Sequence, residues 1–412
     1  MAQQDGLYDA LLARGISRRD FLRFSAAMTA ALSLPGSYTP RIAAAVAAVA
    51  AAPRIPVIWL EGQDCAGNTE GFLRASHPTV ADLVLDVLSV DYHETIMAPS
   101  GKAAEQSMTD TIAKHPNGYV LIVEGGIPMA EGGVYCTIGG RTFESIVRDA
   151  ADKALAIISV GTCAFDGGLP AANGGPTGAV GVNVIAPRAK VINLPGCPMN
   201  VQNFTATIVH FLTFGQWPAL DAMGRPLFAY GQLIHDQCER RAHFDRGEYV
   251  MAWGDAGARN GWCLYKMGCK GPETLANCPT ARFNDGTSWP VKSGHGCVGC
   301  TMPGFWDAMS PFYRRLPAPT PFPSDVTVDQ VGIVLVGGVA ALSAAHGVTA
   351  YARKRRMDTK ASSEIAATAG AGGVAVAAPP DVRPPADPPP MAPPPEPPSA
   401  GSASDQASGR AE

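Results

Sequence analysis

Short apolar runs that end in glycine-rich turns recur along the first half of the chain. They cover residues 57–60, 119–123, 156–160 and 191–194. Uninterrupted apolar runs of this length are typical of strands buried on both faces of a parallel sheet. The segments between them, such as residues 79–89 and 141–154, have the spacing of amphipathic helices. This alternation predicts an α/β fold, with a flavodoxin-like domain and a parallel sheet over residues 53–205.

The strand pattern fades in the next part of the chain, and residues 206–320 are expected to form loops and short helices. A region with so little regular structure depends on bound groups for its stability. The whole chain has 412 residues, a formal net charge of -4 and 17% charged residues. Since no basic stripe runs along it, the sequence gives no indication of a nucleic-acid partner.

One uninterrupted apolar segment lies near the C-terminus, over residues 331–351, and Arg353 to Arg356 follow it directly. At about 1.5 Å per residue, a helix of this length crosses a hydrocarbon core of about 30 Å. Positive residues stay on the cytoplasmic side, so the body of the chain is expected on the periplasmic side of the membrane. Residues 360–412 are rich in alanine, glycine and proline, which predicts a disordered tail.

The N-terminus has the features of an export signal. Arg18 and Arg19 form a twin-arginine sequence, and a modestly apolar run over residues 24–34 follows. An alanine-rich stretch then extends to Ala52. The pattern predicts a twin-arginine signal peptide over residues 1–52, with cleavage between Ala45 and Ala52. The apolar run is too short to span a membrane as an anchor.

Nine of the ten cysteines, together with one histidine, fall into three groups along the chain. The members of the upstream group follow predicted strands. Open parallel sheets bind their ligands at these carboxyl ends of the strands. Its members are Cys65, Cys163 and Cys197. The downstream residues are His235, Cys238, Cys263, Cys269, Cys278, Cys297 and Cys300. Thiolates are the soft ligands of iron-sulfur clusters, and imidazole can replace one of them.

Two other chemistries use cysteines at such spacings. An exported chain reaches a compartment where disulfides form, and the C-x-x-C pair of Cys297 and Cys300 also suits a structural zinc site. The ordered series from Cys238 to Cys300, with a histidine in ligand spacing, favours iron-sulfur clusters. The glycines beside almost every candidate ligand allow backbone N–H groups to turn toward the sulfurs.

At this point the chain resembles the small subunit of membrane-bound nickel-iron uptake hydrogenases. The resemblance covers nearly everything from the twin-arginine signal to the membrane segment and excludes the proline-rich tail. Its most specific stretches are residues 77–79 (HPT), 123–128 (VEGGIP), 161–163 (GTC), 195–198 (PGCP), 233–241 (LIHDQCERR), 261–272 (GWCLYKMGCKGP) and 294–300 (GHGCVGC).

The resemblance implies three clusters and assigns their ligands. The distal 4Fe-4S cluster would be held by His235, Cys238, Cys263 and Cys269, and the medial 3Fe-4S cluster by Cys278, Cys297 and Cys300. The proximal 4Fe-4S cluster would be held by Cys65, Cys163 and Cys197. Cys136 matches no ligand position and is expected to be a small buried apolar side chain.

The proximal group departs from the family pattern. Where the family has C-x-x-C, this chain has Cys65-Ala66-Gly67-Asn68, so the second cysteine is replaced by asparagine. We expect Asp166, in C-x-x-D spacing with Cys163, to supply an oxygen ligand, with Asp64 or Asn68 as alternatives. A second 3Fe-4S cluster, or an aspartate that only caps its loop, would also fit the sequence. Glu124, which ends a predicted strand, suits either a proton path or a structural role.

The function that the resemblance implies is electron transfer. Hydrogen would be oxidised at a nickel-iron centre in a separate large subunit, since this chain lacks the paired C-x-x-C motifs of that centre. Electrons would leave through this chain to a membrane cytochrome b and quinone, and the twin-arginine machinery would export the protein. Two alternatives stay open at this point. One is a membrane-anchored iron-sulfur electron carrier without a hydrogenase partner, and the other is a disulfide-stabilised envelope protein.

Overall fold

The structure, a computed structural model, describes residues 18–50, 54–75, 88–284, 286–316 and 328–369 of the chain. Residues 1–17 of the expected signal, the 77–79 stretch and residues 370–412 of the expected tail therefore lie outside the described residues. The chain divides into two compact units at Leu335, within the long C-terminal helix.

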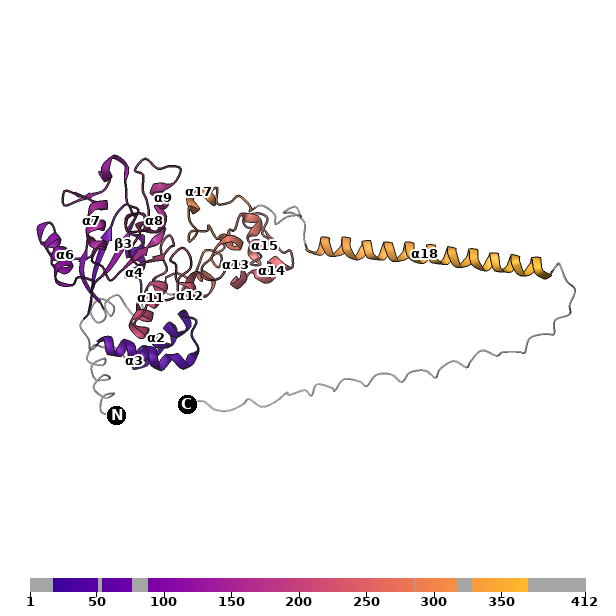
Figure 1. The fold of residues 1–412 in the computed structure, drawn as a ribbon, viewed down its shortest axis with the longest axis horizontal. Coiled ribbons are helices and arrows are strands. Elements are labelled where there is room, and N and C mark those ends of the chain that lie inside the picture. Colours follow the sequence, from indigo (N-terminus) through magenta and orange to yellow (C-terminus); the bar gives the residue numbers. More distant parts are fainter. Residues whose placement is uncertain (1–17, 51–53, 76–87, 285, 317–327, 370–412) are drawn as a thin grey trace, which may run out of the picture. The chain divides into compact units, whose positions relative to one another are not determined.

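The first unit is built on a five-stranded, all-parallel sheet with the order β2-β1-β3-β6-β7 (Figure 1). The strands are β1 (Ile55–Glu61), β2 (Leu88–His93), β3 (Val120–Glu124), β6 (Ala156–Val160) and β7 (Val191–Leu194). In sequence order this is the 2-1-3-4-5 arrangement of flavodoxin-like folds. The fold class expected from the sequence is thereby confirmed. β1, β3, β6 and β7 coincide with the four apolar runs.

β2 is the strand that the apolar pattern did not predict. The sequence suggested a helix over residues 79–89, but residues 88 and 89 begin β2 and residues 79–87 lie outside the described residues. The reason is that this edge strand is only half buried, unlike β7 at the opposite edge. Ser89 and Asp91 alternate with apolar side chains there, and only Leu88, Tyr92 and His93 are buried. A half-buried edge strand lacks the continuous apolar run of the central strands.

The helix expected over residues 141–154 is present as α7 (Phe143–Ala151). It begins after Thr142, whose hydroxyl accepts a hydrogen bond from the Ser145 N–H, as a favourable N-cap does. Its apolar side packs with α6 (Lys102–Lys114) on one face of the sheet. α4 (Gly67–Leu73) and α11 (Val201–Phe214) contribute to the core on the other face.

The core on the α11 face continues past the expected domain boundary at residue 205. The rings of Trp59, Phe72 and Phe204 meet with centroids 5.3–5.9 Å apart. The same buried cluster includes Tyr230 and Trp289 from the region that follows. Residues 53–205 and 206–316 therefore share one core. The later region has the short helices and loops that the sequence predicted.

The other described elements of the first unit are short, apart from two helices near the N-terminus. In the α/β part they are η3 (Ala130–Gly133), β4 (Thr137–Ile138), β5 (Arg141–Thr142), α8 (Gly161–Asp166), α9 (Gly168–Ala171) and α10 (Val182–Ile185). In the later part they are α12 (Leu227–Tyr230), α13 (Ile234–Gln237), α14 (Arg241–Asp245), α15 (Ala256–Arg259), η4 (Tyr265–Met267), η5 (Gly271–Glu273), α16 (Cys278–Ala281) and α17 (Phe305–Ala308). The N-terminal elements are α2 (Arg18–Ala31), η1 (Gly36–Tyr38) and α3 (Thr39–Ala50).

The long C-terminal helix is α18 (Val328–Ala369). Within the described ranges it is long and apolar enough to cross a membrane, over Gly332–Ala367. The helix extends past residue 360, where the disordered tail was expected to begin, so residues 360–369 are helical. Alanine, lysine and glutamate favour helix in this stretch, and the first glycine after it is Gly370.

Candidate functional site: three groups of cysteines in series

The three upstream cysteines meet at one edge of the sheet. Cys65 follows β1, Cys163 lies in α8 directly after β6, and Cys197 follows β7. Burial and the neighbouring thiols of Cys300, Cys163 and Cys65 raise the pKa of Cys197 to about 12. Cys65 and Cys197 are nevertheless exposed in this chain, and Cys163 is partly exposed. The group therefore lies at the surface of this chain.

Two glycines leave room around these sulfurs. A Cβ on Gly67 would lie 3.0 Å from the Sγ of Cys65, and a Cβ on Gly168 would lie 2.6 Å from the Sγ of Cys163. Gly168 also has a positive φ of 52°. Side chains at these two positions would intrude on the sulfurs, which explains why glycine is present at both.

Asn68, which replaces the expected fourth cysteine, is engaged at both ends of its amide. Its Oδ1 accepts a hydrogen bond of 2.8 Å from the Met199 N–H, and its Nδ2 donates one of 3.1 Å to Glu124. The side chain is 7% exposed. Asn68 therefore ties α4 to β3 and to the loop after Cys197.

The carboxylate of Asp166 also has partners in the chain. Oδ1 accepts the Gly168 N–H at 2.9 Å, and Oδ2 accepts the Gly304 N–H at 2.6 Å. Burial raises the pKa of Asp166 despite these two donors. Each oxygen keeps a second lone pair, since a carboxylate offers about four acceptor sites. The loop-capping role is thus visible, and ligation by Asp166 stays a prediction.

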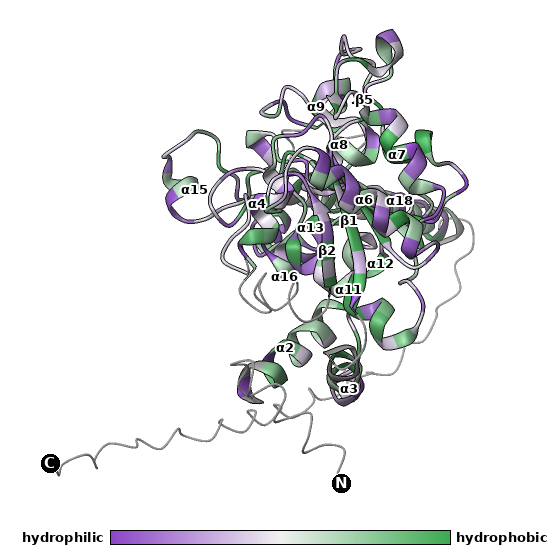
Figure 2. Cartoon of the chain, turned by 90° about the vertical axis from the view of Figure 1, so that its left-hand side faces the viewer, coloured by the Kyte–Doolittle hydropathy of each residue, from purple (hydrophilic) through white to green (hydrophobic). Residues whose placement is uncertain are grey.

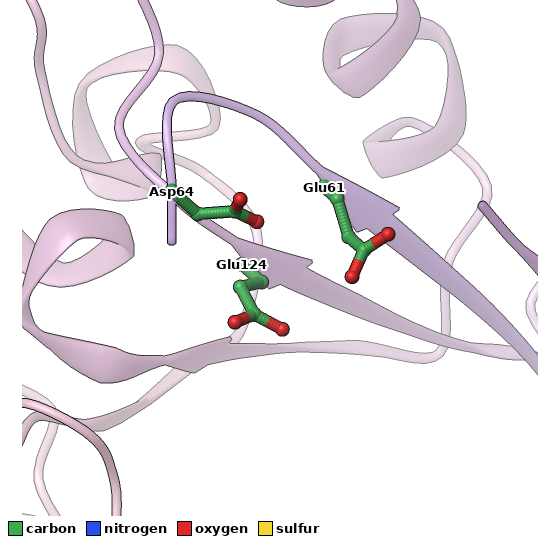
Figure 3. A group of neighbouring side chains, drawn as sticks. All are labelled: Glu61, Asp64 and Glu124. Atoms are coloured by element: carbon green, nitrogen blue, oxygen red, sulfur yellow. The ribbon is translucent and has the colours of Figure 1, made fainter. Parts of the chain in front are cut away.

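Asp64 belongs to a cluster of three carboxylates beside Cys65, shown in Figure 3. Glu61 ends β1, Glu124 ends β3, and Asp64 lies on the loop after β1, with ligand atoms within 4.8 Å of one another. Burial and the nearby charge of Glu124 raise the pKa of Asp64 to about 7. Its Oδ1 accepts the Ala66 N–H at 3.2 Å.

Glu124 is fully buried and accepts hydrogen bonds from several donors. These include the indole N–H of Trp59 at 3.2 Å, the backbone N–H of Asn68 at 2.9 Å and the hydroxyl of Thr69 at 2.7 Å. Such donors compensate the cost of burying a carboxylate. Glu124 therefore has the structural role considered from the sequence, because it fixes the start of α4 next to Cys65. The proton path stays a prediction.

A prediction about the pH dependence of stability follows from Glu94. Burial is the main cause that raises its pKa from 4.5 to about 8, and the charge of Glu61 adds to it. Between these values the folded chain keeps a proton that the unfolded chain releases, so stability falls as pH rises from 4.5 to 8. We expect Glu94→Gln to reduce this fall, measured as the denaturation midpoint at pH 5 and pH 8.

The matched control is Glu70→Gln, because Glu70 is 57% exposed and lies on the nearby helix α4. This substitution should leave the pH dependence of the denaturation midpoint as it is in the wild type. An equal slope in Glu94→Gln and wild type would show that Glu94 does not retain its proton in the folded chain.

The histidine and the first three downstream cysteines line one pocket. The four candidate ligands that share it are His235, Cys238, Cys263 and Cys269. The Arg240 N–H donates to the Sγ of Cys238 at 3.4 Å. Burial and the charge of Arg241 lower the pKa of His235, which favours the neutral imidazole that binds metals.

The remaining three cysteines, Cys278, Cys297 and Cys300, form a group that we call the buried group, although Cys300 is partly exposed. Cys278 and Cys297 are each 7% exposed. Burial, together with the thiols of Cys269, Cys300 and Cys278, raises the pKa of Cys297. The Gly299 N–H donates to the Sγ of Cys297 at 3.4 Å. With only three thiols, the group leaves a fourth position open.

Three contacts join the three groups into a series. The Cys297 N–H donates to the Sγ of Cys269 at 3.2 Å, which links the buried group to the histidine-containing group. Burial raises the pKa of Cys300, and a hydrogen bond from the Cys197 backbone lowers it. This hydrogen bond links the buried group to the upstream group. The Thr162 hydroxyl beside Cys163 also donates to the Cys300 carbonyl at 2.5 Å. The buried group thus lies between the other two.

The donor set fits iron-sulfur clusters better than the other two chemistries. All ten cysteines, which all belong to the described ranges, are free thiols, so no disulfide supports an envelope protein stabilised by cystines. Cys136 is partly buried against the apolar core beside α7 and takes no part in the three groups. Thiols, one imidazole, glycine-lined loops and N–H groups directed at sulfur are the features of cluster sites. Fold and site together define an iron-sulfur electron-transfer protein.

Comparison with known proteins gives the family. Residues 230–313 match the family of the C-terminal domain of the NiFe/NiFeSe hydrogenase small subunit. Residues 65–211 match the family described as NADH ubiquinone oxidoreductase, 20 Kd subunit. Residues 15–35 match the twin-arginine translocation signal.

Curated relatives cover most of the chain. An uptake hydrogenase small subunit of Azotobacter vinelandii is 44% identical over 86% of this chain and 98% of its own length. A quinone-reactive Ni/Fe-hydrogenase small chain of Wolinella succinogenes is 46% identical over 81% of this chain and 96% of its own. The chain therefore belongs to the nickel-iron hydrogenase small-subunit family.

Solved structures agree with this assignment. A nickel-iron-selenium hydrogenase of Desulfomicrobium baculatum superimposes with a TM-score of 0.61 at 35% identity, over 64% of this chain and all of that chain. An actinobacterial-type hydrogenase of Ralstonia eutropha gives a TM-score of 0.60 at 26% identity, over 71% of this chain and 90% of that chain. The protein is thus an electron-transfer subunit whose catalytic nickel-iron centre lies in a large-subunit partner. The electron carrier without a hydrogenase partner is not supported.

Proposed function

We propose that this chain carries electrons from hydrogen oxidation in the large subunit to a membrane cytochrome b and quinone. The observation that supports the proposal is the series of three ligand groups joined by the Cys297–Cys269 and Cys197–Cys300 contacts. One relative has a name that describes it as quinone-reactive. The family carries iron-sulfur clusters, which accept and donate single electrons.

The three groups differ in their ligand number, and this difference sets the clusters that they hold. The proximal group (Cys65, Cys163, Cys197 and, as an oxygen ligand, Asp166) holds a 4Fe-4S cluster. The medial group (Cys278, Cys297 and Cys300) holds a 3Fe-4S cluster, and the distal group (His235, Cys238, Cys263 and Cys269) holds a second 4Fe-4S cluster.

The proximal end of the series faces the large subunit. Cys65 and Cys197 are exposed in this chain, although cluster ligands are usually shielded from water. Apolar side chains also lie exposed near this edge, with Leu169 beside Gly168 at 56% and Val184 in α10 at 61%. Exposed apolar side chains of this size are typical of an interface. A subunit docked there would cover both the sulfurs and the apolar surface.

The membrane end is set by α18. Its apolar stretch is followed by Arg353 to Arg356, which stay on the cytoplasmic side. The body with its clusters is then on the periplasmic side, anchored by a single C-terminal helix. The twin-arginine machinery exports the chain to that side, in agreement with the match at residues 15–35.

The cluster assignment predicts the spectrum of the purified complex. In the air-oxidised complex, electron paramagnetic resonance should show the signal of a 3Fe-4S cluster, because the medial group has three thiol ligands and no fourth. Cys278→Ser should remove or alter that signal. If the oxidised complex has no such signal, the medial assignment is wrong.

The fourth proximal ligand is tested by Asp166→Ala. Loss of a carboxylate ligand should change the spectrum of the reduced proximal cluster, since oxygen is a harder ligand than sulfur. The control is Asp307→Ala, because Asp307 likewise caps a loop, accepting the Asn173 N–H with both oxygens at 3.0 Å. A spectrum that is unchanged in Asp166→Ala, or equally changed in both variants, would contradict the ligand role.

A further inference from the structure

We infer that the export signal of the unprocessed chain docks on helix α11 of its own body, and that it must be released before recognition and cleavage. The two signal helices, α2 and α3, lie beside α11 in the views of Figures 1 and 2. The contact belongs to the first unit and involves none of the cluster ligands. The inference is therefore independent of the proposed electron route.

The contact is a packed apolar core. Phe24 and Met28 of α2 are 8% and 2% exposed, and Ile42 of α3 is fully buried. They form one cluster with Ala206 and Val209 of α11, which are 0% and 3% exposed. Burial of apolar side chains of this size stabilises the docked position relative to an undocked signal. A helix pair that was free in solution would expose this face.

The hairpin itself is held in one geometry. The Thr29 and Thr39 hydroxyls, one from each helix, lie 3.0 Å apart. At the far end of α11, the Arg41 guanidinium lies 4.8 Å from the centre of the Phe214 ring, and the Tyr38 ring lies 6.2 Å from it. The polar contact and the ring contacts make the docking specific, beyond what apolar area alone provides.

The docking surface exists only when the body has folded. Val209 and Ala206 face the signal, while Phe204 of the same helix packs on Trp59 in the core of the sheet. α11 is therefore positioned by the sheet. A body that has not folded cannot present this surface, so docking of the signal reports that the α/β part is complete.

Docking hides two parts of the signal that export needs. The apolar run contributes its largest side chains, Phe24, Met28 and Leu32, to the contact, while Arg19 stays exposed. The region expected to contain the cleavage site, which begins at Ala45, is helical as far as Ala50 in α3. Proteases act on locally opened chain, so cleavage there requires α3 to unwind first.

The first test is limited trypsin digestion of the purified complex with the signal attached, followed at Arg41. We expect slow cleavage in the wild type and about tenfold or faster cleavage in Met28→Asp, because a charge cannot stay in the buried contact. The matched control is Ala26→Asp, which adds the same charge to an exposed position of the same helix. It should be cleaved at the wild-type rate. Cleavage that is equally fast in wild type and Met28→Asp would overturn the docking.

The second test leaves the signal unaltered. Val209→Asp places the charge on α11, and pulse-chase labelling in cells should show conversion of precursor to mature chain at least about twofold faster than in the wild type. The cluster spectrum of the matured complex checks that the body has folded. Conversion at the wild-type rate, with trypsin cleavage at Arg41 accelerated, would overturn the claim that release limits export. If trypsin cleavage is not accelerated either, the docking itself is contradicted.

Discussion

Replacement of Cys163 by serine should abolish electron exit, and this is the largest effect that we expect from a single substitution. Cys163 lies in α8, directly at the end of β6, and Gly168 packs against its sulfur at a distance that excludes a side chain. Serine is a poor ligand for iron compared with thiolate. Because the proximal group has only three cysteines, a loss there leaves two thiols to hold the cluster.

The measurement is hydrogen-dependent reduction of a viologen dye by the complex, captured through a tag on this chain. Cys136→Ser is the control, since Cys136 is a partly buried thiol of the same domain that lies outside the three groups. Full activity in Cys136→Ser and loss of activity in Cys163→Ser, with both exported, is the expected result. If Cys163→Ser blocks export instead, the residue acts mainly in folding.

The second large effect is expected from Asp221→Asn, which should destabilise the region of residues 206–316 by about 3 kcal/mol. The guanidinium of Arg225 is fully buried, and its Nε lies 2.8 Å from the Asp221 carboxylate. Its Nη1 donates to the Thr301 carbonyl at 3.0 Å, next to Cys300, a ligand of the proposed medial cluster. Removal of the negative partner leaves a buried charge uncompensated, which typically costs about 3–5 kcal/mol.

The control for this effect is Asp149→Asn. Asp149 pairs with Arg141 on the surface, where the side chains are 66% and 40% exposed, so at most about 1 kcal/mol is expected. The denaturant concentration at which the signal of the proposed medial cluster is lost should fall in Asp221→Asn and stay nearly unchanged in Asp149→Asn. Equal midpoints in the two variants would show that the buried pair does not stabilise the loop of Thr301.

The sequence predicted β1, β3, β6 and β7 because each is a continuous apolar run. β2 was missed because Ser89 and Asp91 interrupt its apolar pattern. The shared core could not be predicted either. Trp289 lies far from β1 in the sequence but belongs to the same buried cluster as Trp59, and no local pattern indicates such a contact.

The sequence predicted the candidate ligands and the meeting of the upstream cysteines at the strand ends, but not the contacts that surround them. Asp166 Oδ2 accepts a hydrogen bond from the N–H of Gly304, which lies 138 residues away. A C-x-x-D spacing gives no indication of such a distant donor. The two hydrogen bonds of Asn68, to Met199 and Glu124, likewise depend on how the strand ends meet. The docking of the signal on α11 was missed for the same reason, since its sequence indicates an apolar run but not the surface that covers it.

The measurement that tests the account most directly is the reduction of b-type haem by hydrogen in native membranes that contain this protein. The proposed route predicts that hydrogen reduces the haem in membranes with the wild-type chain, that added quinone reoxidises it, and that membranes with Cys163→Ser show neither change. Haem that stays oxidised under hydrogen, while the complex captured from the same membranes reduces viologen, would contradict the route from this chain to a membrane cytochrome b.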